Sequence, residues 1–475
     1  MLLPKFKDRL NRLLLWPKNA CQVKQQQMPA EEPPLRAELL NVDQLERHAR
    51  SIAGAHRLAT TPAEDRLLSR LAENENVLVD AYDLIAAAAA KNRRIAPAAE
   101  WLLDNFYLIE EQIRSTRRLL PRSYSSELPR IAAGPGVTFP RVYSIALELI
   151  AHTDGRMDCA SLTGFLTAYQ SVVPLKLGEL WALPLMLRLA LIENLRRVAV
   201  RIARGRCDRD QASDWAEQMI RTVEQKPTDL VLVLADMARE NPPLTGAFLA
   251  ELTRHLQGQN PNFSFASSWL EQRLSDHGQT TEQLILAEGQ AQAADQVSVG
   301  NSITSLRFLA VNDWRKFVAD QSLVEQTLSR DPAGIYSTMD FSTRDRYRHA
   351  VEAIARRSTC NEYDVAQRAV QLAQAEVGVQ SDVRMHHVGF FLVDHGRPAL
   401  ERLVQMRLTF GVAVEKFRRR FPLPIYTFAV MAITLTVFAV LRNYSRDLQP
   451  GKPLMWLMAF PILMSAGQLD RKSVV

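Results

Sequence analysis

The sequence LGELWALPLMLRLALIENLRRVAVRIARG, residues 177–205, decides the fold of this chain. Its aliphatic side chains return every three or four residues, which is the spacing of one face of an α-helix. That face comprises Leu180, Leu183, Leu187, Leu191, Leu195, Val198 and Ile202. Pro184 predicts a kink, or marks the start of the main part of the helix, because proline lacks an N–H and crowds the preceding turn.

The same periodicity recurs along the chain up to about residue 420, in runs of roughly 10 to 20 residues. Proline, glycine or asparagine separates the runs, and no convincing period of two residues predicts a strand. A chain of 475 residues exceeds one small core, so we expect two or three domains or one extended helical array. We therefore predict an all-α fold with a multi-helix cytoplasmic body at residues 36–420, in one or two subdomains.

A second helical stretch, WLLDNFYLIEEQIRSTRRLLPRSYSSELPRI, covers residues 101–131. Its apolar stripe is Leu102, Phe106, Ile109, Ile113 and Leu120, and Pro121 ends the helix. The charged residues Glu110, Glu111, Arg114, Arg117 and Arg118 lie mostly off the stripe. Their helical spacing favours ion pairs over acid–base catalysis. Two roles stay open: a solvated face, or the docking of this helix on a neighbouring domain.

Composition excludes several classes of protein. The chain is 47% apolar and 23% charged, with a net charge of +6, which is ordinary for a globular protein. No aromatic platform interleaves with its basic residues, so we expect no nucleic-acid partner. The cysteines, Cys21, Cys159, Cys207 and Cys360, lie far apart without CxxC or Cys/His spacing, which argues against a zinc site, a redox pair or a disulfide framework. A reducing compartment is expected.

The N-terminal 35 residues differ from the rest. MLLPKFKDRLNRLLLWPK, residues 1–18, alternates apolar and basic positions at helical spacing, and a Pro-rich linker, QQQMPAEEPPL, follows at residues 25–35. The basic amphipathic part suits an anionic membrane surface, a frayed tail or packing on protein. All three interpretations stay open.

Two apolar runs near the C-terminus predict a transmembrane helical hairpin. Residues 423–441 carry no charge, and 19 residues span roughly 28 Å, close to a hydrocarbon core of about 30 Å. Residues 453–469 are shorter, contain Pro461 and are predicted to cross back. The basic run before residue 423 favours a cytoplasmic body, although basic residues in the connector at 442–452 weaken that asymmetry. We expect a multi-pass protein of the bacterial inner membrane.

No specific catalytic motif occurs: GxSxG, HExxH, GxxxxGK[ST], GxGxxG and QxxRW are all absent. Asp208 and Asp210 form a DxD pair, but the pair follows a basic helix end instead of a strand, so we do not expect it to bind metal. His386, His387, Asp394 and His395 are the nearest approach to a metal cluster, and we expect ordinary core or surface histidines. We predict no catalytic, cofactor-binding or metal-binding residue in this chain.

The helix at residues 177–205 also carries a basic set: Arg196, Arg197, Arg201, Arg204 and Arg206. These arginines suit lipid phosphates or an acidic partner domain. A solvated helix face is the default expectation.

Five stretches, in order along the chain, resemble the N-terminal region of bacterial cyclic β-1,2-glucan synthases. They are EWLLDNFYLIEEQIRSTRRLLPRSYSSELPRI, GELWALPLMLRLALIENLRRVA, NSITSLRFLAVNDWRKF, DPAGIYSTMDFSTRDRYRHAVEAIARRS and HHVGFFLVDHGRPALE. The resemblance implies a large inner-membrane enzyme that polymerises glucose from UDP-glucose into a β-1,2-glucan, closes it into a ring and supplies periplasmic glucan. UDP-glucose and a divalent metal are then expected in a transferase module beyond Val475.

The resemblance makes this chain a membrane-anchored scaffold or regulatory portion of such a synthase, inactive alone. Its expected partners are the lipid bilayer, the downstream glycosyltransferase module and a glucan chain. The last residues, GQLDRKSVV, depart from the family, so we expect a truncated gene product. The alternative is a stand-alone membrane-anchored helical adaptor without catalytic activity.

Overall fold

A computed structural model of the chain describes residues 32–59, 66–121, 124–132, 139–257, 263–276, 278–376 and 383–406, with single residues and short pieces between 423 and 439. Every named element in these ranges is helical, and two isolated bridges, Leu58 with Ile131 and Arg130 with Pro140, are the strand-like pairings among them. The all-α prediction is confirmed. The chain divides into two compact units after Thr338, and each is described by itself.

The first unit contains α3 (Val42–Ala55), α4 (Leu67–Ala90), α5 (Pro97–Asp104), α6 (Phe106–Leu119), η1 (Tyr124–Glu127), α7 (Arg141–Thr153), α8 (Cys159–Gln170), α9 (Leu177–Gln225), η2 (Pro227–Asp229), α10 (Leu230–Glu240), α11 (Gly246–Leu256), α12 (Phe263–Ser275), α13 (Thr281–Val311), α14 (Trp314–Gln321), α15 (Leu323–Leu328) and η3 (Tyr336–Thr338). The second contains α16 (Phe341–Ala355), α17 (Glu362–Ala375), η4 (Val383–His386), α18 (Val388–Val393) and α19 (Arg397–Leu403).

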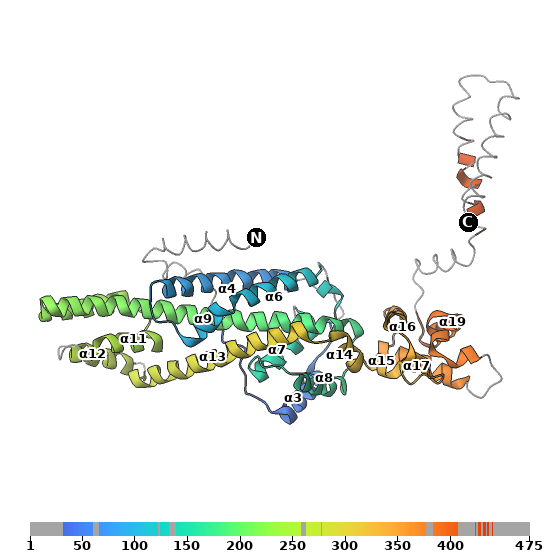
Figure 1. Ribbon diagram of the computed structural model, residues 1–475, viewed down its shortest axis with the longest axis horizontal. Helices are drawn as coiled ribbons and strands as arrows, with labels where there is room; N and C mark the ends of the chain where they lie inside the picture. The colour runs from blue at the N-terminus through green and yellow to red at the C-terminus, as the bar shows by residue number, and fades with distance from the viewer. Residues whose placement is uncertain are drawn as a thin grey trace, which may run out of the picture. The chain divides into compact units, whose positions relative to one another are not determined.

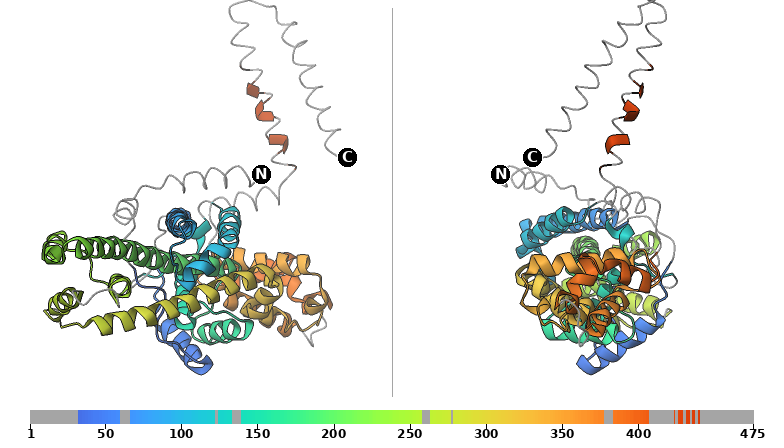
Figure 2. Two further views of the ribbon diagram at one scale, coloured as in Figure 1. Left: turned by 60° about the vertical axis from the view of Figure 1, so that its left-hand side comes forward. Right: turned by 90° about the vertical axis from the view of Figure 1, so that its right-hand side faces the viewer.

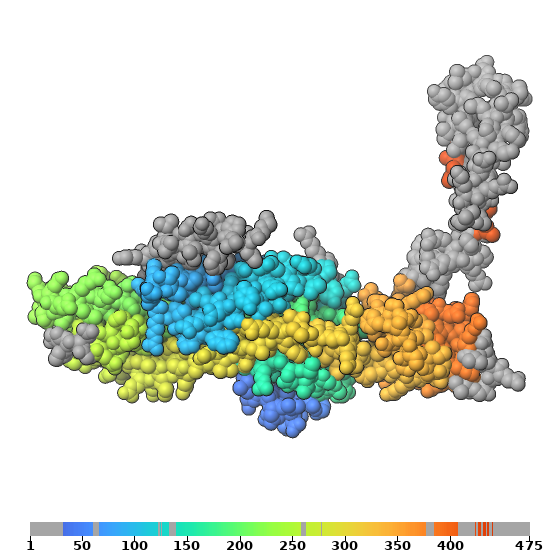
Figure 3. Space-filling model, in the orientation of Figure 1, coloured from blue at the N-terminus to red at the C-terminus, as the bar shows by residue number. Residues whose placement is uncertain are grey.

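Helix α9 is the axis of the first unit. Helices α4, α6, α7, α11 and α13 all contact it (Figure 1). The two views of Figure 2 place α4 and α6 on one side of α9, with α3 and α8 toward the other. In the space-filling view, α4, α6 and α13 cover the middle of this unit, and α9 reaches the surface mainly toward its C-terminal end (Figure 3).

The sequence explains why α9 is enclosed. The predicted stripe, from Leu180 to Ile202, is buried, but so are residues on other faces of the helix, such as Met186, Ala190 and Val200. A helix that is apolar on most sides needs neighbours on most sides. Pro184 lies inside α9, after its first two turns, so the hydrogen bond that proline cannot donate is lost near the N-terminal end of the helix.

The helix does not end at the basic residues near 205, as the sequence suggested. It continues without a break through Gly205 to Gln225. Beyond Ala212, α9 packs on α10, α11 and α12 in a second hydrophobic cluster that includes Trp215, Met219 and Phe248. Glycine weakens a helix interior by about 1 kcal/mol, which the packing on both sides of Gly205 offsets.

The stretch at residues 101–120 forms two helices, α5 and α6, which meet at Asn105. The predicted stripe of Leu102, Phe106, Ile109, Ile113 and Leu120 is confirmed, because all five side chains are buried in the main hydrophobic cluster. Asn105 accepts a hydrogen bond from Arg307 of α13 at 2.7 Å, so the junction itself is held against another helix.

A polar seam joins α9 to α13. The Asn194 side chain donates to the hydroxyls of Ser298 and Ser302 at 3.0 and 3.2 Å and accepts from the backbone N–H of Leu35 at 3.0 Å. Gly155 lies against this seam with φ +74°, and a Cβ there would meet the Ser302 hydroxyl at 2.7 Å. A side chain at position 155, in the turn between α7 and α8, would therefore clash with α13, and the positive φ favours glycine there as well.

The second unit is a small cluster in which α16, α17, α18 and α19 contact one another. Buried Val351, Ile354, Val365 and Leu392 lie among these helices. Asp340 begins α16 as its N-cap, with the side chain accepting from the backbone N–H groups of the next turn.

Residues 1–31 of the predicted N-terminal segment and nearly all of residues 407–475 lie outside the described part of the chain. Most of the predicted hairpin, 423–441 and 453–469, therefore falls outside it. Within the described residues, no helix has the length and apolar character that a membrane crossing requires.

A buried ion pair fixes the start of α9. Arg141, the first residue of α7, donates through Nε to Glu179 Oε1 at 2.8 Å, and its Nη2 contacts Glu179 Oε2 as well. The side chains are 1% and 0% exposed. Glu179 Oε2 also accepts from the Lys176 backbone N–H at 2.9 Å, which caps α9. One carboxylate therefore joins two helix starts.

Changing Arg141→Met should lower the free energy of unfolding by about 3 to 5 kcal/mol, because Glu179 would be left buried without its cation. The double change R141M/E179L should cost less than the sum of the two single changes, because it removes both charges. Urea unfolding, monitored by far-ultraviolet circular dichroism, measures the free energy of unfolding of each variant.

Arg221→Ala is the matched control, because Arg221 pairs with Glu217 at the surface of the same helix. Its effect should stay within about 0.5 kcal/mol. If Arg141→Met were as stable as Arg221→Ala, the buried Arg141–Glu179 pair would not stabilise the start of α9.

Candidate functional site

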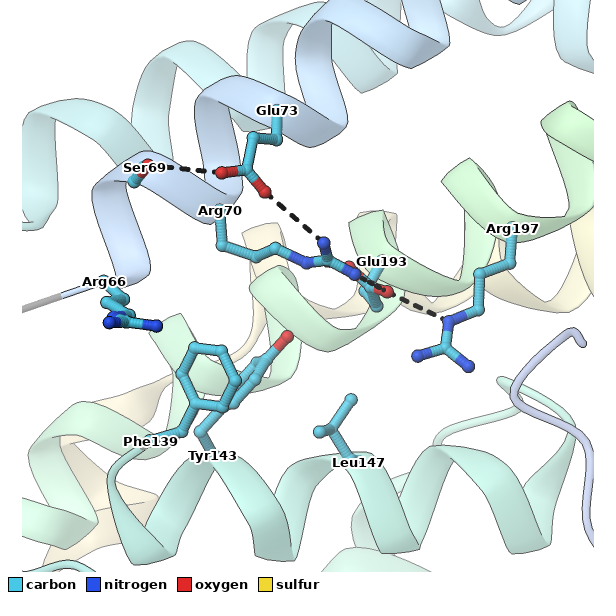
Figure 4. Close-up of a pocket in the computed structure, with 9 residues that line it drawn as sticks. All are labelled: Arg66, Ser69, Arg70, Glu73, Phe139, Tyr143, Leu147, Glu193 and Arg197. Atoms are coloured by element: carbon cyan, nitrogen blue, oxygen red, sulfur yellow. Dashed lines mark hydrogen bonds and ion pairs between the residues drawn. The ribbon is translucent and has the colours of Figure 1, made fainter. Parts of the chain in front are cut away.

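A pocket of about 600 Å³ lies where α4, α7 and α9 face one another (Figure 4). Its lining consists of Arg66, Ser69, Arg70, Glu73, Phe139, Tyr143, Leu147, Glu193 and Arg197. Figure 4 shows the Arg70 guanidinium between Glu73 and Glu193, with Arg197 approaching Glu193 from the other side. The rings of Phe139 and Tyr143 lie beneath these charges.

Glu193 is the centre of the charged part. Its oxygens accept from both Nε and Nη2 of Arg70, at 3.0 and 2.7 Å, and also from Arg196 and Arg197, each at 2.9 Å. The Glu193 side chain is 2% exposed. Glu32, from the segment before α3, contacts the same three arginines at 2.9 to 3.6 Å. With Glu73, which pairs with Arg70 at 3.4 Å, three cations and three carboxylates thus form one network.

The electrostatics suit binding and positioning better than proton transfer. Burial opposes ionisation of Glu193, but hydrogen bonds and charges of Arg70 and Arg196 outweigh burial and lower the pKa of this carboxyl to about 2. Burial raises the pKa of Tyr143 above its ordinary value, and the nearby Glu193 charge adds to the effect. Near pH 7, Glu193 is a weak base and Tyr143 keeps its proton, so neither matches the pKa that general acid–base catalysis requires.

The pocket floor is aromatic. Phe139 and Tyr143 meet edge to face, with ring centroids 5.2 Å apart, and Leu147 extends the apolar surface. A rim of paired arginines and glutamates over such a floor suits a ligand with hydroxyl groups on one side and a flat apolar face on the other.

The two acids of the DxD pair contact different partners. Asp208 accepts from the Thr245 hydroxyl at 2.8 Å, whereas Asp210 forms ion pairs with Arg93 and Arg206. Both acids lie inside α9, so they project from a helix in different directions. Their partners hold α9 against α11 and the end of α4.

The expectation of a solvated basic face is wrong for Arg196 and Arg206, which are buried. The reason is that acidic side chains of the same chain meet the basic set. Arg196 and Arg197 pair with Glu193, while Arg201 pairs with Asp295 of α13. Burial of Asp295 raises its pKa, and Arg201 opposes that rise.

The histidines near residue 390 contact different partners. His386 Nε2 lies 3.0 Å from the backbone oxygen of Glu376, and His387 Nε2 lies 3.4 Å from the Tyr347 hydroxyl. His395 is 92% exposed, 3.7 Å from Asp394. The structure does not bring these three rings to one point.

The charged residues of α6 form one ion pair along the helix and one to a neighbouring helix. Glu110 pairs with Arg114 along the helix at 3.6 Å, and Arg117 pairs with Glu75 of α4. The Arg117 contact favours a docking role for this face, but the partner is a neighbouring helix of the same unit.

Sequence reasoning missed the Arg70–Glu193 pair, because 123 residues separate its members. A local signal was nevertheless present. Glu193 interrupts an aliphatic run and stands three and four residues before Arg196 and Arg197, a spacing that lets one carboxylate meet both.

Comparison with known proteins confirms the class of protein that the sequence resembles: the chain is related to the cyclic β-1,2-glucan synthases. The relative found is the cyclic beta-(1,2)-glucan synthase NdvB of Rhizobium meliloti (strain 1021), 32% identical over 411 residues. The match covers 84% of this chain but 14% of that protein, so the chain spans about one seventh of its relative's length. No family model matches the chain.

Glu193→Gln should weaken the dependence of the free energy of unfolding on pH below about pH 5. The carboxyl has a pKa of about 2 in the folded chain against roughly 4.3 when unfolded, so its stabilisation is complete above the unfolded value and disappears as pH falls toward 2. Between about pH 5 and 2, the unfolding free energy of the native chain should fall more steeply than that of the variant.

Thermal unfolding across this pH range provides the measurement. Glu217→Gln, an exposed change on the same helix, should keep the native slope. Equal slopes for all three proteins would exclude Glu193 as a source of the acid sensitivity.

Proposed function

We propose that this chain is a non-catalytic scaffold portion of a cyclic β-1,2-glucan synthase, and that it positions the transferase portion that polymerises glucose from UDP-glucose. The observation that carries this proposal is the match of 84% of the chain to 14% of such a synthase. The remaining part of the synthase is then the source of the transferase activity, of UDP-glucose binding and of the divalent metal.

The buried ion pairs of the first unit support a scaffold role. Glu193 and Glu179 contact arginines of α4 and α7, and Asp210 contacts Arg93, which follows the end of α4; these pairs hold α9 against its neighbours. A catalytic acid or base needs a free proton-transferring form near pH 7, whereas the pKa of Glu193 lies near 2.

The proposal includes anchoring in the bacterial inner membrane through residues 423–441 and 453–469, with the helical body on the cytoplasmic side. Supporting it, the described apolar residues of the first segment are exposed: Leu423, Tyr426, Phe428, Met431, Ile433 and Leu435. Apolar side chains exposed on successive turns suit a lipid environment.

The pocket over Phe139 and Tyr143 is our candidate contact for a glucan chain. Its aromatic floor offers a face for sugar rings, and its arginines offer hydrogen-bond donors to hydroxyls. The alternative function is a stand-alone membrane-anchored adaptor, and the experiment below separates the two.

The chain alone, in membranes with labelled UDP-glucose, should produce no protein-bound glucan. Co-expression with the remaining part of the synthase as a separate chain should restore labelled glucan. With the Arg141→Met chain, the restored glucan synthesis should fall in proportion to the fraction of the chain that no longer folds. With the Arg221→Ala chain, glucan synthesis should be fully restored.

Two results would overturn the proposal. Glucan made by the chain alone would place a catalytic centre within it. Full activity of the remaining part without this chain, together with no association between the two, would favour the adaptor.

A further inference from the structure

Two histidines and a glutamate, none of which lines the pocket, meet between α3 and α7. His48 comes from α3, and Glu148 and His152 lie one turn apart on α7. One ligand atom of each residue lies within 4.8 Å of the others. His48 Nε2 is 3.0 Å and His152 Nε2 is 3.6 Å from the same atom, Glu148 Oε2.

The proton on His152 has a fixed place. Its Nδ1 lies 2.8 Å from the backbone oxygen of Glu38, which can only accept a hydrogen bond. Nδ1 therefore carries the proton, and in the neutral ring the Nε2 lone pair faces the Glu148 carboxylate. Two electron-rich atoms then lie 3.6 Å apart, an arrangement in which one metal ion can bind both.

The distances suit a metal ion. Ligands about 2.0 to 2.1 Å from a tetrahedral zinc ion lie about 3.3 Å from one another, and the two measured separations bracket that value. The hydrogen bond from His152 to Glu38 is the outer contact that metal-bound histidines usually make, since it fixes the ring and its tautomer.

The surroundings leave one position open. His56, just beyond the end of α3, is held elsewhere, because its Nδ1 is 2.8 Å from the Tyr169 hydroxyl. The Glu148 side chain is 42% exposed, so water can reach the cluster. Three protein ligands with a solvent-accessible fourth position are typical of an exchangeable zinc site.

We propose that His48, Glu148 and His152 bind one zinc ion, with water as the fourth ligand, and that this ion joins α3 to α7. Backbone contacts already place the preceding segment there, because the Ala37 and Leu40 N–H groups donate to the oxygens of Ala151 and His152 at 2.9 and 3.2 Å. The site requires no part of the proposed synthase function.

The test uses the full chain without a polyhistidine tag, stripped of metal and titrated with Zn²⁺ against a chromophoric chelator. We expect one saturable site, and a Co²⁺ form with the visible spectrum of a four-coordinate ion with nitrogen and oxygen ligands. His48→Ala and His152→Ala should each weaken zinc binding at least about 100-fold, as expected for the loss of a ligand.

Glu148→Gln keeps the shape of the side chain and an acceptor for His48, so this variant should fold while binding zinc at least about 10-fold more weakly. His349→Ala is the matched control, because His349 also lies near two acids, Asp345 and Glu352, but is 65% exposed. This control should bind zinc as the native chain does.

Zinc should also raise the melting temperature of the native chain and of His349→Ala, but not of His152→Ala. Absence of saturable binding, or binding that all three ligand substitutions leave unchanged, would overturn the proposal.

Discussion

Enclosure of α9 is the constraint on which the first unit depends. A helix surrounded by neighbours cannot place its charges in water, so each buried charge needs a partner from another helix. Glu179 meets Arg141, Glu193 meets Arg70, and Arg201 meets Asp295. Because each pair joins α9 to a different helix, the pairs also specify which neighbours pack and in what register.

This constraint explains why the charge-rich pocket is a weak candidate for catalysis. The neighbouring arginines stabilise the ionised form of Glu193. One of them, Arg70, also holds α4 against α9. The apolar floor of Phe139 and Tyr143 and the rim of paired arginines and glutamates are consequences of packing that remain available to a ligand. Binding and structural roles are compatible here, because both need a fixed geometry.

Helical periodicity made much of the fold predictable. The stripes on α6 and α9 follow from local spacing, and their burial is confirmed. The C-terminal end of α9 was not predictable, because Gly205 and the basic residues resemble a helix end unless the helices packed beyond them are known. Arg196 looked solvated for the same reason: Glu32 comes from a distant segment. His48 and His152 are likewise 104 positions apart, although the spacing of Glu148 and His152 was visible.

The continuity of α9 has a mechanical consequence. Cys207 belongs to the main hydrophobic cluster and Ala212 to the second, and one unbroken helix of about 74 Å joins them. A stiff rod set in two separate cores transmits force along its axis. A tilt or translation of this helix would therefore displace both cores together, so the packing of α10–α12 is coupled to that of α4 and α7.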